Sequence, residues 1–294
     1  MNRTVIRVLN KLGLLQQFNV AGSLVINKKR FQIPIIQNLG YDNLFMSEPW
    51  MLEVLKIVFS IDKGKFVDVG VNIGQTLLKV KSVVPDIPYI GFEPNPVCVY
   101  YSGKLVKVNR IADVKIYPLA ISSSSGIGEL NYYYDSDTDS AASVVTNFRL
   151  DQKIVRSEFI VKSSLDAIKD FIDLQDLSVL KIDVEGAEFE VITAFRDEIS
   201  AWKPIILMEI LPAYSSANTD RISNQNSIVQ ILRELDYSMF RIKKSDGNLK
   251  DLNEITDIEI HSDLDACDYV MVPAAKRVRF IDAYRNALQR EFGS

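Results

Sequence analysis

The sequence predicts an α/β fold in which a mostly parallel sheet is covered by helices on both faces. Short apolar runs that read as strands alternate along most of the chain with helical stretches, and this alternation is typical of parallel sheets. The last two strand-like runs, 237–242 and 267–273, have no helical stretch between them. Because a parallel crossover usually needs a helix, we expect the last strand to run antiparallel to its neighbours.

The first part of the chain, 1–60, is expected to form a basic, helical extension to a main domain at 61–275. Residues 1–20 place apolar side chains among Arg3, Arg7 and Lys11, which indicates an amphipathic helix. The first acid is Asp42, so the start of the chain is basic. Packing of this helix on its own domain is the favoured interpretation, and contact with a membrane surface or another anionic partner is the alternative.

A second helix is expected at 51–59, because Ser47 or Glu48 can cap it and Pro49 suits its first turn. The pattern then predicts three strands separated by two helices. The strands are expected at 66–70, 89–93 and 114–120, and the helices begin at residues 76 and 96.

The alternation is interrupted after residue 120 and then resumes. Two further strands are expected at 129–134 and 158–162 on either side of a polar tip, and Ser164 is expected to cap a helix. Buried strands are predicted at 179–183 and 204–210, with a helix opening at residue 186 between them. A polar loop at 214–226 is long enough to suggest a lid, and helices follow at 228–235 and 276–294.

Composition excludes several classes of protein. The 294 residues are 47% hydrophobic with a net charge of −4, which argues against a nucleic-acid partner. No uncharged apolar run is long enough for a membrane-spanning helix. Cys98 and Cys267 lie far apart in apolar segments, so we expect reduced core thiols and a cytoplasmic location.

The strand–turn–helix at 66–81 contains the first candidate site. Gly70 and Gly74 suit a backbone that turns sharply and approaches a ligand closely. The next strand ends in Glu93, and an acid at that place can accept hydrogen bonds from both hydroxyls of a ribose. The Gly-x-Asn-x-Gly spacing differs from the pattern that cradles a pyrophosphate. These residues therefore predict a nucleoside-binding site.

Three motifs together resemble the FkbM type of S-adenosylmethionine-dependent methyltransferases. They are Phe-Val-Asp-Val-Gly-Val-Asn-Ile-Gly-Gln at 66–75, Gly-Phe-Glu-Pro-Asn-Pro at 91–96 and Leu-Lys-Ile-Asp-Val-Glu-Gly-Ala-Glu at 180–188. The resemblance covers about residues 60–275, and Val71 stands where the family usually has Ala. It implies a Rossmann-like class I methyltransferase fold, with a seven-stranded, mostly parallel sheet whose last strand is antiparallel.

The resemblance also implies roles for individual residues. S-adenosyl-L-methionine is the expected cofactor, and a hydroxyl of a sugar, a glycan or another natural product is the expected acceptor. Glu93 would bind the ribose, the glycine turn would line the methionine part, and Asp183 would face the cofactor's amino group or the acceptor. The expected cofactor-binding residues are Asp68, Gly70, Asn72, Gly74, Gln75, Thr76, Glu93, Pro94, Asn95, Ala120 and Asp183.

Transfer of a methyl group to a hydroxyl is helped by a base that takes the hydroxyl proton. The candidates are the carboxylates at strand ends, Asp183, Glu185 and Glu209. The same three acids could instead hold magnesium, but their spacing is not diagnostic and no metal site is assigned. The single histidine, His261, lies in an acidic loop and is interpreted as a solvated residue.

Two other functions share part of this pattern. A nicotinamide-dependent oxidoreductase would have the same first strand and ribose acid, but the third glycine and a catalytic Tyr-x-x-x-Lys are missing. A non-catalytic binder could keep the cofactor fold as a scaffold. The acceptor and a homo-oligomeric state are left open by the sequence.

Overall fold

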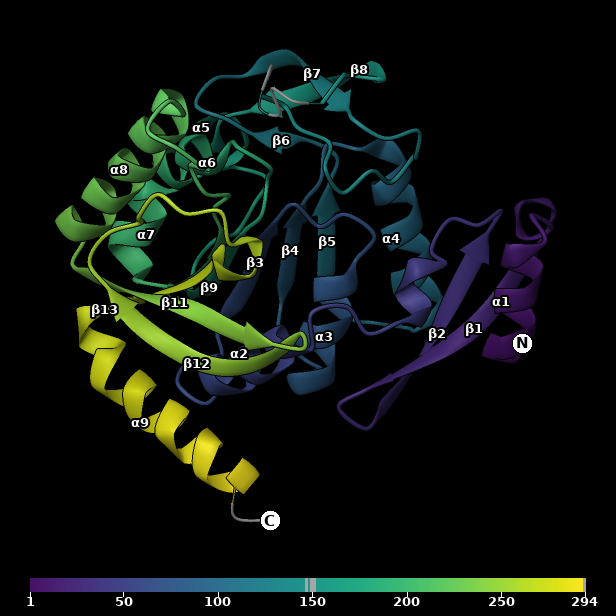
Figure 1. The fold of residues 1–294 in the computed structure, drawn as a ribbon, viewed down its shortest axis with the longest axis horizontal. Coiled ribbons are helices and arrows are strands. Elements are labelled where there is room, and N and C mark those ends of the chain that lie inside the picture. Colours follow the sequence, from purple (N-terminus) through teal and green to yellow (C-terminus); the bar gives the residue numbers. More distant parts are fainter. Residues whose placement is uncertain (146–147, 149–151, 293–294) are drawn as a thin grey trace.

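A central sheet of eight strands organises the protein, in the order β12-β11-β13-β10-β9-β3-β4-β5. The computed structural model describes residues 1–145, 148 and 152–292. Figure 1 shows the sheet with helices in front of it and behind it, which confirms the predicted α/β fold.

The middle of the sheet is parallel, and β3, β4, β9 and β10 are buried along nearly their whole length. Strand β3 pairs in parallel with β4 on one side and with β9 on the other, and β9 pairs in parallel with β10. Apolar side chains leave these strands on both faces, which is why their sequences read as continuous hydrophobic runs. The strands are β3 (Lys65–Val69), β4 (Tyr89–Phe92), β5 (Val114–Tyr117), β9 (Leu177–Ile182) and β10 (Ile205–Glu209).

The other edge of the sheet is antiparallel. Strand β13 (Asp268–Pro273) runs antiparallel to both β10 and β11 (Tyr237–Ser245), which confirms the predicted direction of the last strand. The expected number of seven strands is wrong by one, because β12 (Asn248–Ile255) forms a hairpin with β11. Gly247, with φ +75°, lies in the hairpin turn, and the pair Asp246-Gly247 is the sequence signal for that turn.

Helices cover both faces of the sheet. One hydrophobic core joins the sheet to α6, α7 and α8, and another joins its opposite face to α2, α3 and α9. Helix α4 lies beside β5 and also packs against β2. The helices of the main domain are α2 (Pro49–Phe59), α3 (Gln75–Val83), α4 (Pro96–Val108), α5 (Leu165–Ile168), α6 (Glu188–Ala194), α7 (Arg196–Trp202), α8 (Thr219–Glu234) and α9 (Ala274–Phe292). Single-turn 3₁₀ helices are η1 (Leu15–Gln17), η2 (Asp42–Leu44) and η3 (Leu264–Ala266).

The sequence predicts a helical N-terminal extension, but the extension is helical only in part. Helix α1 (Arg3–Lys11) is present, but β1 (Asn19–Ile26) and β2 (Lys29–Ile36) form an antiparallel hairpin between α1 and α2. Asn27 and Lys28 make its two-residue turn with φ values of 47° and 64°, a left-handed conformation that suits the twist of a hairpin. The alternation of buried and exposed residues in both strands is the pattern that was missed.

A second small sheet stands over the C-terminal ends of the parallel strands. It has the order β6-β8-β7, with β6 (Ala120–Ile121), β7 (Gly126–Tyr132) and β8 (Arg156–Ser163). The antiparallel pairing of β7 and β8 matches the two strands predicted around a polar tip. Figure 1 shows this sheet at the same end of the molecule as the C-terminal ends of β3 and β4.

The predicted lid loop at 214–226 is wrong for most of its length. Helix α8 begins at Thr219, and Asn218 just before it accepts hydrogen bonds on its side-chain oxygen from the backbone N–H groups of Tyr214 and Ser215. The polar residues 219–226 lie on the first turns of a helix whose buried face begins only at Gln225.

In the described part of the chain, no helix has both the length and the apolar character needed to cross a membrane.

Candidate functional site

A cavity of about 350 Å³ opens at the C-terminal ends of the parallel strands. In parallel α/β sheets ligands bind at this edge, because the loops that follow the strands meet there. Eleven of the thirteen predicted site residues line the cavity. They are Gly70, Asn72, Gln75, Thr76, Glu93, Pro94, Asn95, Ala120, Asp183, Glu185 and Glu209.

Asp68 does not line the cavity, which corrects its expected contact with the cofactor. Its side chain is completely buried beneath the cavity floor, where it accepts hydrogen bonds from the Tyr89 hydroxyl and the Lys181 ammonium. Burial raises the pKa of Asp68, and the ammonium of Lys181 opposes that rise. Asp68 therefore contributes to the site indirectly, because it holds Lys181, which pairs with Asp183 on the cavity wall.

The two glycines of the first motif have packing roles. An added Cβ on Gly70, whose φ is +94°, would lie 1.9 Å from the carbonyl oxygen of Asp183. Gly70 thus lets the ends of β3 and β9 come together, because any side chain there would collide with the backbone of Asp183. Gly74 (φ +76°) caps α3 facing Leu105 and is the second predicted residue that does not line the cavity.

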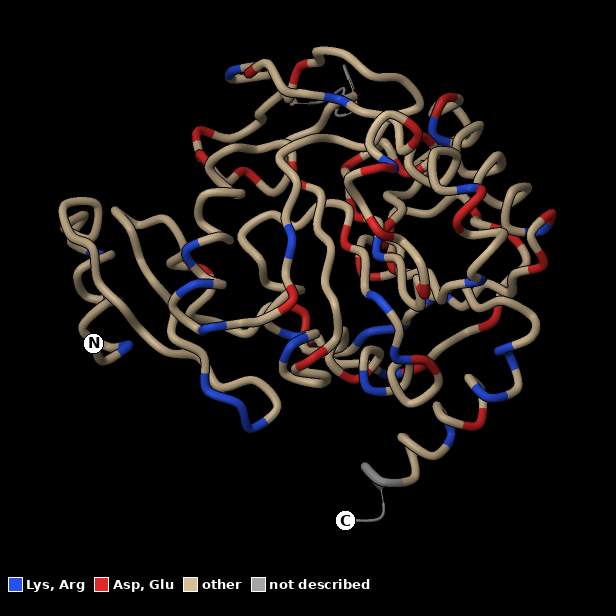
Figure 2. Tube along the Cα trace, turned by 180° about the vertical axis from the view of Figure 1, so that it is seen from behind, with Lys and Arg blue, Asp and Glu red and all other residues tan. Residues whose placement is uncertain are grey.

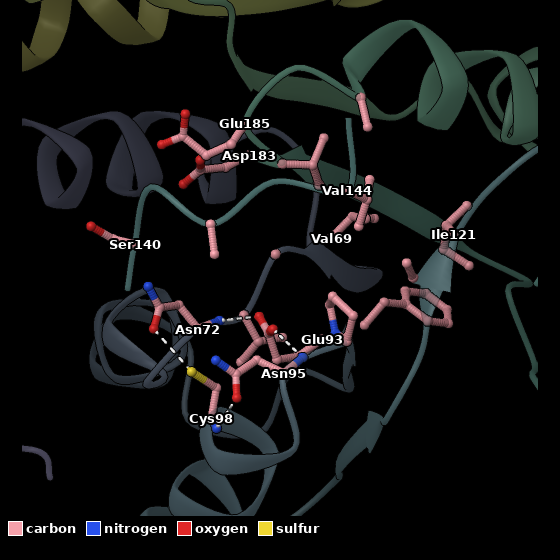
Figure 3. Close-up of a pocket in the computed structure, with 18 of the residues that line it drawn as sticks. Val69, Asn72, Glu93, Asn95, Cys98, Ile121, Ser140, Val144, Asp183 and Glu185 are labelled. Carbon is pink, nitrogen blue, oxygen red and sulfur yellow. Dashed lines mark hydrogen bonds between the residues drawn. The ribbon is translucent and has the colours of Figure 1, made fainter. Parts of the chain in front are cut away.

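Glu93 is held by the backbone on both sides of its carboxylate. One oxygen accepts a hydrogen bond from the N–H of Asn72 at 2.7 Å, and the other accepts from the N–H of Asn95 at 2.8 Å (Figure 3). A carboxylate oxygen can accept a second hydrogen bond, so this group still has acceptor capacity for a ligand. Burial raises the pKa of Glu93 to about 7, although both N–H groups favour its charge.

Asn95 has a structural role beside the cavity. Its side-chain oxygen caps α4 by accepting from the N–H groups of Val97 and Cys98, and its amide donates to the carbonyl of Asp137. Asp137 belongs to the β7–β8 connection, so Asn95 joins the second motif to the wall of the cavity. Asn95 lies next to Glu93, the expected ribose ligand, and its polar side-chain atoms already have partners within the protein.

An apolar slot lies beyond Glu93. Phe92, Leu119, Ile121 and Val144 line it together with Leu130, Ala142 and Val191. Figure 3 places Ile121 and Val144 on the far side of the cavity from Cys98. Such a surface can pack against a flat, uncharged ring, while the adjacent Glu93 accepts from hydroxyl groups.

A buried ion pair shapes the opposite side of the cavity. The ammonium of Lys181 lies 3.1 Å from a carboxylate oxygen of Asp68 and 3.1 Å from one of Asp183. Burial disfavours its charge, but the two carboxylates outweigh burial and raise the pKa of Lys181. Lys181 was not predicted from the sequence, although it stands between the motif residues Leu180 and Asp183 and could have been recognised as a charge inside a buried strand.

Asp183 and Glu209 share a hydrogen bond between their carboxyl groups, and they titrate as a pair. Burial and the charge of Asp183 raise the pKa of Glu209 well above its usual range. Although Asp183 is also disfavoured by burial, Lys181 lowers its pKa. At neutral pH Glu209 therefore carries the proton and Asp183 the charge, which opposes the predicted role of Glu209 as a base.

Glu48 is a cavity residue that the sequence did not reveal. It lies before α2 with a left-handed φ of 44°, and its carboxylate is 2.9 Å from the buried ammonium of Lys79. Non-glycine residues in this strained conformation cluster at functional sites. Only a tertiary contact brings Glu48 from the extension to the cavity, so no local pattern could have identified it.

The β7–β8 connection closes one wall of the cavity. Asp139 folds it by accepting hydrogen bonds from the N–H groups of Tyr133, Tyr134 and Ala141, and Ser140 lines the cavity beside it. The Ser143 hydroxyl donates to the carbonyl of Glu185 at 2.6 Å, which ties this wall to the loop after β9.

Magnesium binding by the acids at the strand ends was the alternative to a carboxylate base. Among the described residues, no three His, Cys, Asp or Glu side chains are arranged to hold a metal ion. Figure 3 shows Asp183 and Glu185 close together on one side, with Asn72, Glu93 and Asn95 on the other. The alternative use of Asp183, Glu185 and Glu209 as magnesium ligands thus gains no support from their positions.

The residues present fit S-adenosyl-L-methionine, which was expected from the sequence. Glu93 can accept from its ribose hydroxyls, the apolar slot suits its adenine, and the cavity is mostly acidic where a cationic sulfonium would need compensation. Lys181 uses its three N–H donors on Asp68, Asp183 and the carbonyl of Gly70, so it positions Asp183 on the cavity wall. These groups come from the ends of β3, β4 and β9, the elements that carry the three motifs.

The chain is similar in sequence to two fungal methyltransferases. Methyltransferase sdnD of Sordaria araneosa is 26% identical over 171 residues, which cover 47% of this chain and 66% of that protein. Methyltransferase 1 of Beauveria bassiana is 26% identical over 151 residues, which cover 47% of this chain and 60% of that protein. The matched part therefore spans less than two thirds of either relative.

Among solved structures, methyltransferase FkbM from Methylobacillus flagellatus has a TM-score of 0.43 at 17% identity, covering 71% of this chain and 44% of that one. The methyltransferase PaMTH1 of Podospora anserina has a TM-score of 0.40 at 8% identity, covering 74% of this chain and 75% of that one. The family model described as the methyltransferase FkbM domain matches residues 68–239, more than half of the chain. The protein belongs to the FkbM methyltransferase family, and its cofactor is S-adenosylmethionine.

Proposed function

We propose that this methyltransferase acts on a hydroxyl group of a small polyhydroxylated acceptor, a sugar, a glycan or another natural product. The observation that carries the proposal is the position of Asp183, a charged carboxylate on the cavity wall opposite Glu93. Its side chain is 35% exposed, in contrast to the fully buried Asp68. An acceptor hydroxyl can therefore reach Asp183.

When bound, S-adenosylmethionine supplies an electrophilic methyl group on a sulfonium sulfur. The protein's task is to align the acceptor oxygen, exclude water and accept the hydroxyl proton as the new bond forms. Asp183 is the proposed proton acceptor, and Lys181 fixes its orientation through the 3.1 Å ion pair. Glu185, on the same side of the cavity, is the second candidate for this role.

Glu209 takes a different role in this proposal. As the protonated partner of Asp183 it donates a hydrogen bond, which holds the Asp183 carboxylate in place. Two other polar groups on the walls, Glu48 and Ser140, face the same cavity. Carboxylates and hydroxyls at such positions are suited to bind the several hydroxyl groups of a sugar-like acceptor.

A cytoplasmic location is proposed on the state of the cysteines. Cys98 and Cys267, the two cysteines of the sequence, are both buried and free. Reduced thiols of this kind are typical of a reducing compartment.

The test is methyl transfer to matched acceptors. Purified protein is incubated with methyl-labelled S-adenosylmethionine and pairs of sugars that differ by one group, a hydroxyl or an amine at the same carbon. Label transferred to the hydroxyl member, with mass spectrometry locating the methyl on oxygen, is the expected result. Preferential methylation of the amine, or of carbon, would overturn the proposal while leaving the family assignment intact.

A further inference from the structure

Helix α1 has a wider apolar surface than the one it buries. Ile6 is completely buried and Leu9 partly buried against the core of the β1–β2 hairpin. Val5, Val8 and Leu12 are 47%, 50% and 64% exposed. Their spacing of three and four residues places them in one line along the helix, which we name the apolar stripe. The favoured prediction that α1 packs on its own protein is therefore confirmed for only one part of its apolar surface.

The charges around the apolar stripe have one sign. Residues 1–41 contain six Lys and Arg and no Asp or Glu, whereas the rest of the chain has 28 Lys and Arg against 38 Asp and Glu. The six basic residues are Arg3, Arg7, Lys11, Lys28, Lys29 and Arg30. Within the described ranges, none of the six forms a salt bridge with a carboxylate.

One cation of the helix and one of the hairpin lie next to each other, while the turn of the hairpin contacts α3 through Asn27 and Lys29. Arg3 donates to the backbone carbonyl of Ser23, and Arg30 donates to the Ser23 hydroxyl, so side chains from α1 and β2 meet at one residue of β1. Val25, 50% exposed, lies close by on the same strand. Figure 1 shows α1 on the outer side of the hairpin at an edge of the molecule, and Figure 2 shows the basic hairpin turn.

We propose that α1 and the turn of the β1–β2 hairpin bind the surface of an anionic lipid bilayer. An interfacial helix buries an apolar stripe at the level of the lipid headgroups while its cations contact anionic lipids. A second copy of this chain is a poorer occupant, because pairing the same face would bring two groups of six cations together. A nucleic-acid backbone would satisfy the cations and leave the apolar stripe in water.

The test is sedimentation of the purified full chain with vesicles. Vesicles of phosphatidylcholine alone are compared with vesicles of equal parts phosphatidylcholine and phosphatidylserine, at low and at raised salt. We expect binding to the phosphatidylserine vesicles only, weakened by salt because headgroup charges are screened. The variant K11E/K28E and the variant V8S/L12S should each lower the partition coefficient by about tenfold or more.

Matched controls separate this surface from general effects. Val278 is 67% exposed on α9 and Lys250 is exposed on β12, so V278S and K250E make the same kinds of change elsewhere. Both controls should bind vesicles like the unaltered chain, and thermal melts should show that every variant is folded.

Three outcomes would overturn the proposal. They are equal binding to phosphatidylcholine vesicles, absence of binding to phosphatidylserine vesicles at low salt, and binding that K11E/K28E and V8S/L12S leave unchanged. Light scattering is measured in parallel. Concentration-dependent dimers that V8S/L12S abolishes, without vesicle binding, would assign the face to a second copy. Retention on polyglutamate without vesicle binding would assign it to an acidic protein.

Discussion

The two sides of the cavity are held by different forces. On the side of Glu93, which we name the backbone-held side, the carboxylate is fixed by the N–H groups of Asn72 and Asn95. On the side of Asp183, which we name the charge-held side, the carboxylate is fixed by Lys181, whose other partner is Asp68. The first arrangement depends on local turns. The second depends on two ion pairs of Lys181, one that joins β9 to β3 and one at the C-terminal end of β9 itself.

This difference indicates a division of labour. Backbone donors keep their direction whatever the side chains nearby, so the backbone-held side offers a constant site for a constant cofactor. Removal of one partner of a buried ion pair lowers the stability of the protein, because the remaining charge stays buried without a partner of opposite sign. Changes on the charge-held side should therefore affect turnover and stability, and changes on the backbone-held side should affect cofactor affinity.

The largest effect is expected for Asp183→Asn. The variant keeps the shape of the side chain but loses the proton acceptor, so kcat should fall by about two to four orders of magnitude with the cofactor Kd nearly unchanged. Glu209→Gln should cost about tenfold or less, because a protonated Glu209 and a Gln both donate to Asp183. Steady-state kinetics and calorimetry measure the two quantities.

Asp173→Asn is the control, since its carboxylate is on the surface and 67% exposed. Loss of cofactor binding in Asp183→Asn would make Asp183 a cofactor ligand instead of a base. A loss of turnover in Glu209→Gln as large as in Asp183→Asn would place the proton acceptor on Glu209.

The next effect is on stability. Lys181→Met should lower the free energy of unfolding by about 3–5 kcal/mol, because it leaves Asp68 and Asp183 without their shared cation. Lys65→Met is matched to it, as Lys65 pairs with the exposed Asp173 and should contribute about 1 kcal/mol or less. Urea denaturation of both variants measures the difference. If both variants lose the same free energy of unfolding, the buried ion pairs of Lys181 contribute no more to stability than the exposed pair of Lys65.

The contrast between the two sides also explains what could be predicted from the sequence. Glu93, Asn72 and Gly70 lie in short motifs at strand ends, where the order of the chain alone brings them to one edge of the sheet. Strand β12 was missed because it is polar and mostly exposed, so it lacks an apolar run, although Asp246-Gly247 marks its turn. The β1–β2 hairpin was missed because its Asn27-Lys28 turn has no glycine to mark it.

The charge-held side was only half predicted for a physical reason. Asp183 and Glu209 could be found as strand-end acids, but their shared proton depends on burial and on the distance between two strands. Glu48 and Lys79 belong to different helical segments and meet only in the folded chain. Local patterns carry no information on such pairs, so the protonation state of the site could not be derived from them.

A smaller effect is expected for Glu93→Gln. The amide keeps one acceptor oxygen but loses the charge, so the affinity for S-adenosylmethionine should fall by about ten- to a hundredfold, the range for hydrogen bonds to a charged group. The measured kcat at saturating cofactor should change little. Calorimetry gives the affinity, with Glu129→Gln on β7 as a control for an exposed carboxylate. Unchanged affinity would remove Glu93 from the ribose site.

The same carboxylate predicts a pH dependence of cofactor binding. Because burial raises the pKa of Glu93 to about 7, the free protein carries a neutral carboxyl group below that pH. If the ionised form binds the cofactor, affinity should fall by about tenfold for each pH unit below 7 and level off above it. Glu93→Gln should flatten this profile. A wild-type affinity that is constant from pH 5 to 8, or that rises as pH falls, would contradict the assignment.

The smallest effect is expected where the charge-held side meets the β7–β8 wall. The guanidinium of Arg221 lies 4.6 Å from the Phe148 ring centre and 5.3 Å from that of Tyr214, and it donates to the carbonyls of Phe148 and Pro212. The Phe148 ring packs directly on Gly186, since a Cβ added there would lie 2.4 Å from it. Arg221 thereby holds Phe148, a residue of the β7–β8 wall, against the loop that follows Asp183.

Arg221→Lys keeps the charge and loses the planar stacking and the forked donor. We expect the KM for the acceptor to rise by about two- to fivefold, the equivalent of one exposed cation–π contact, with the cofactor Kd unchanged. Arg233→Lys lies on the same helix but binds Asp257 away from the cavity, so it should change neither quantity. An equal rise in the cofactor Kd for Arg221→Lys would show that the wall serves both sides of the cavity, and the division between them would then be wrong.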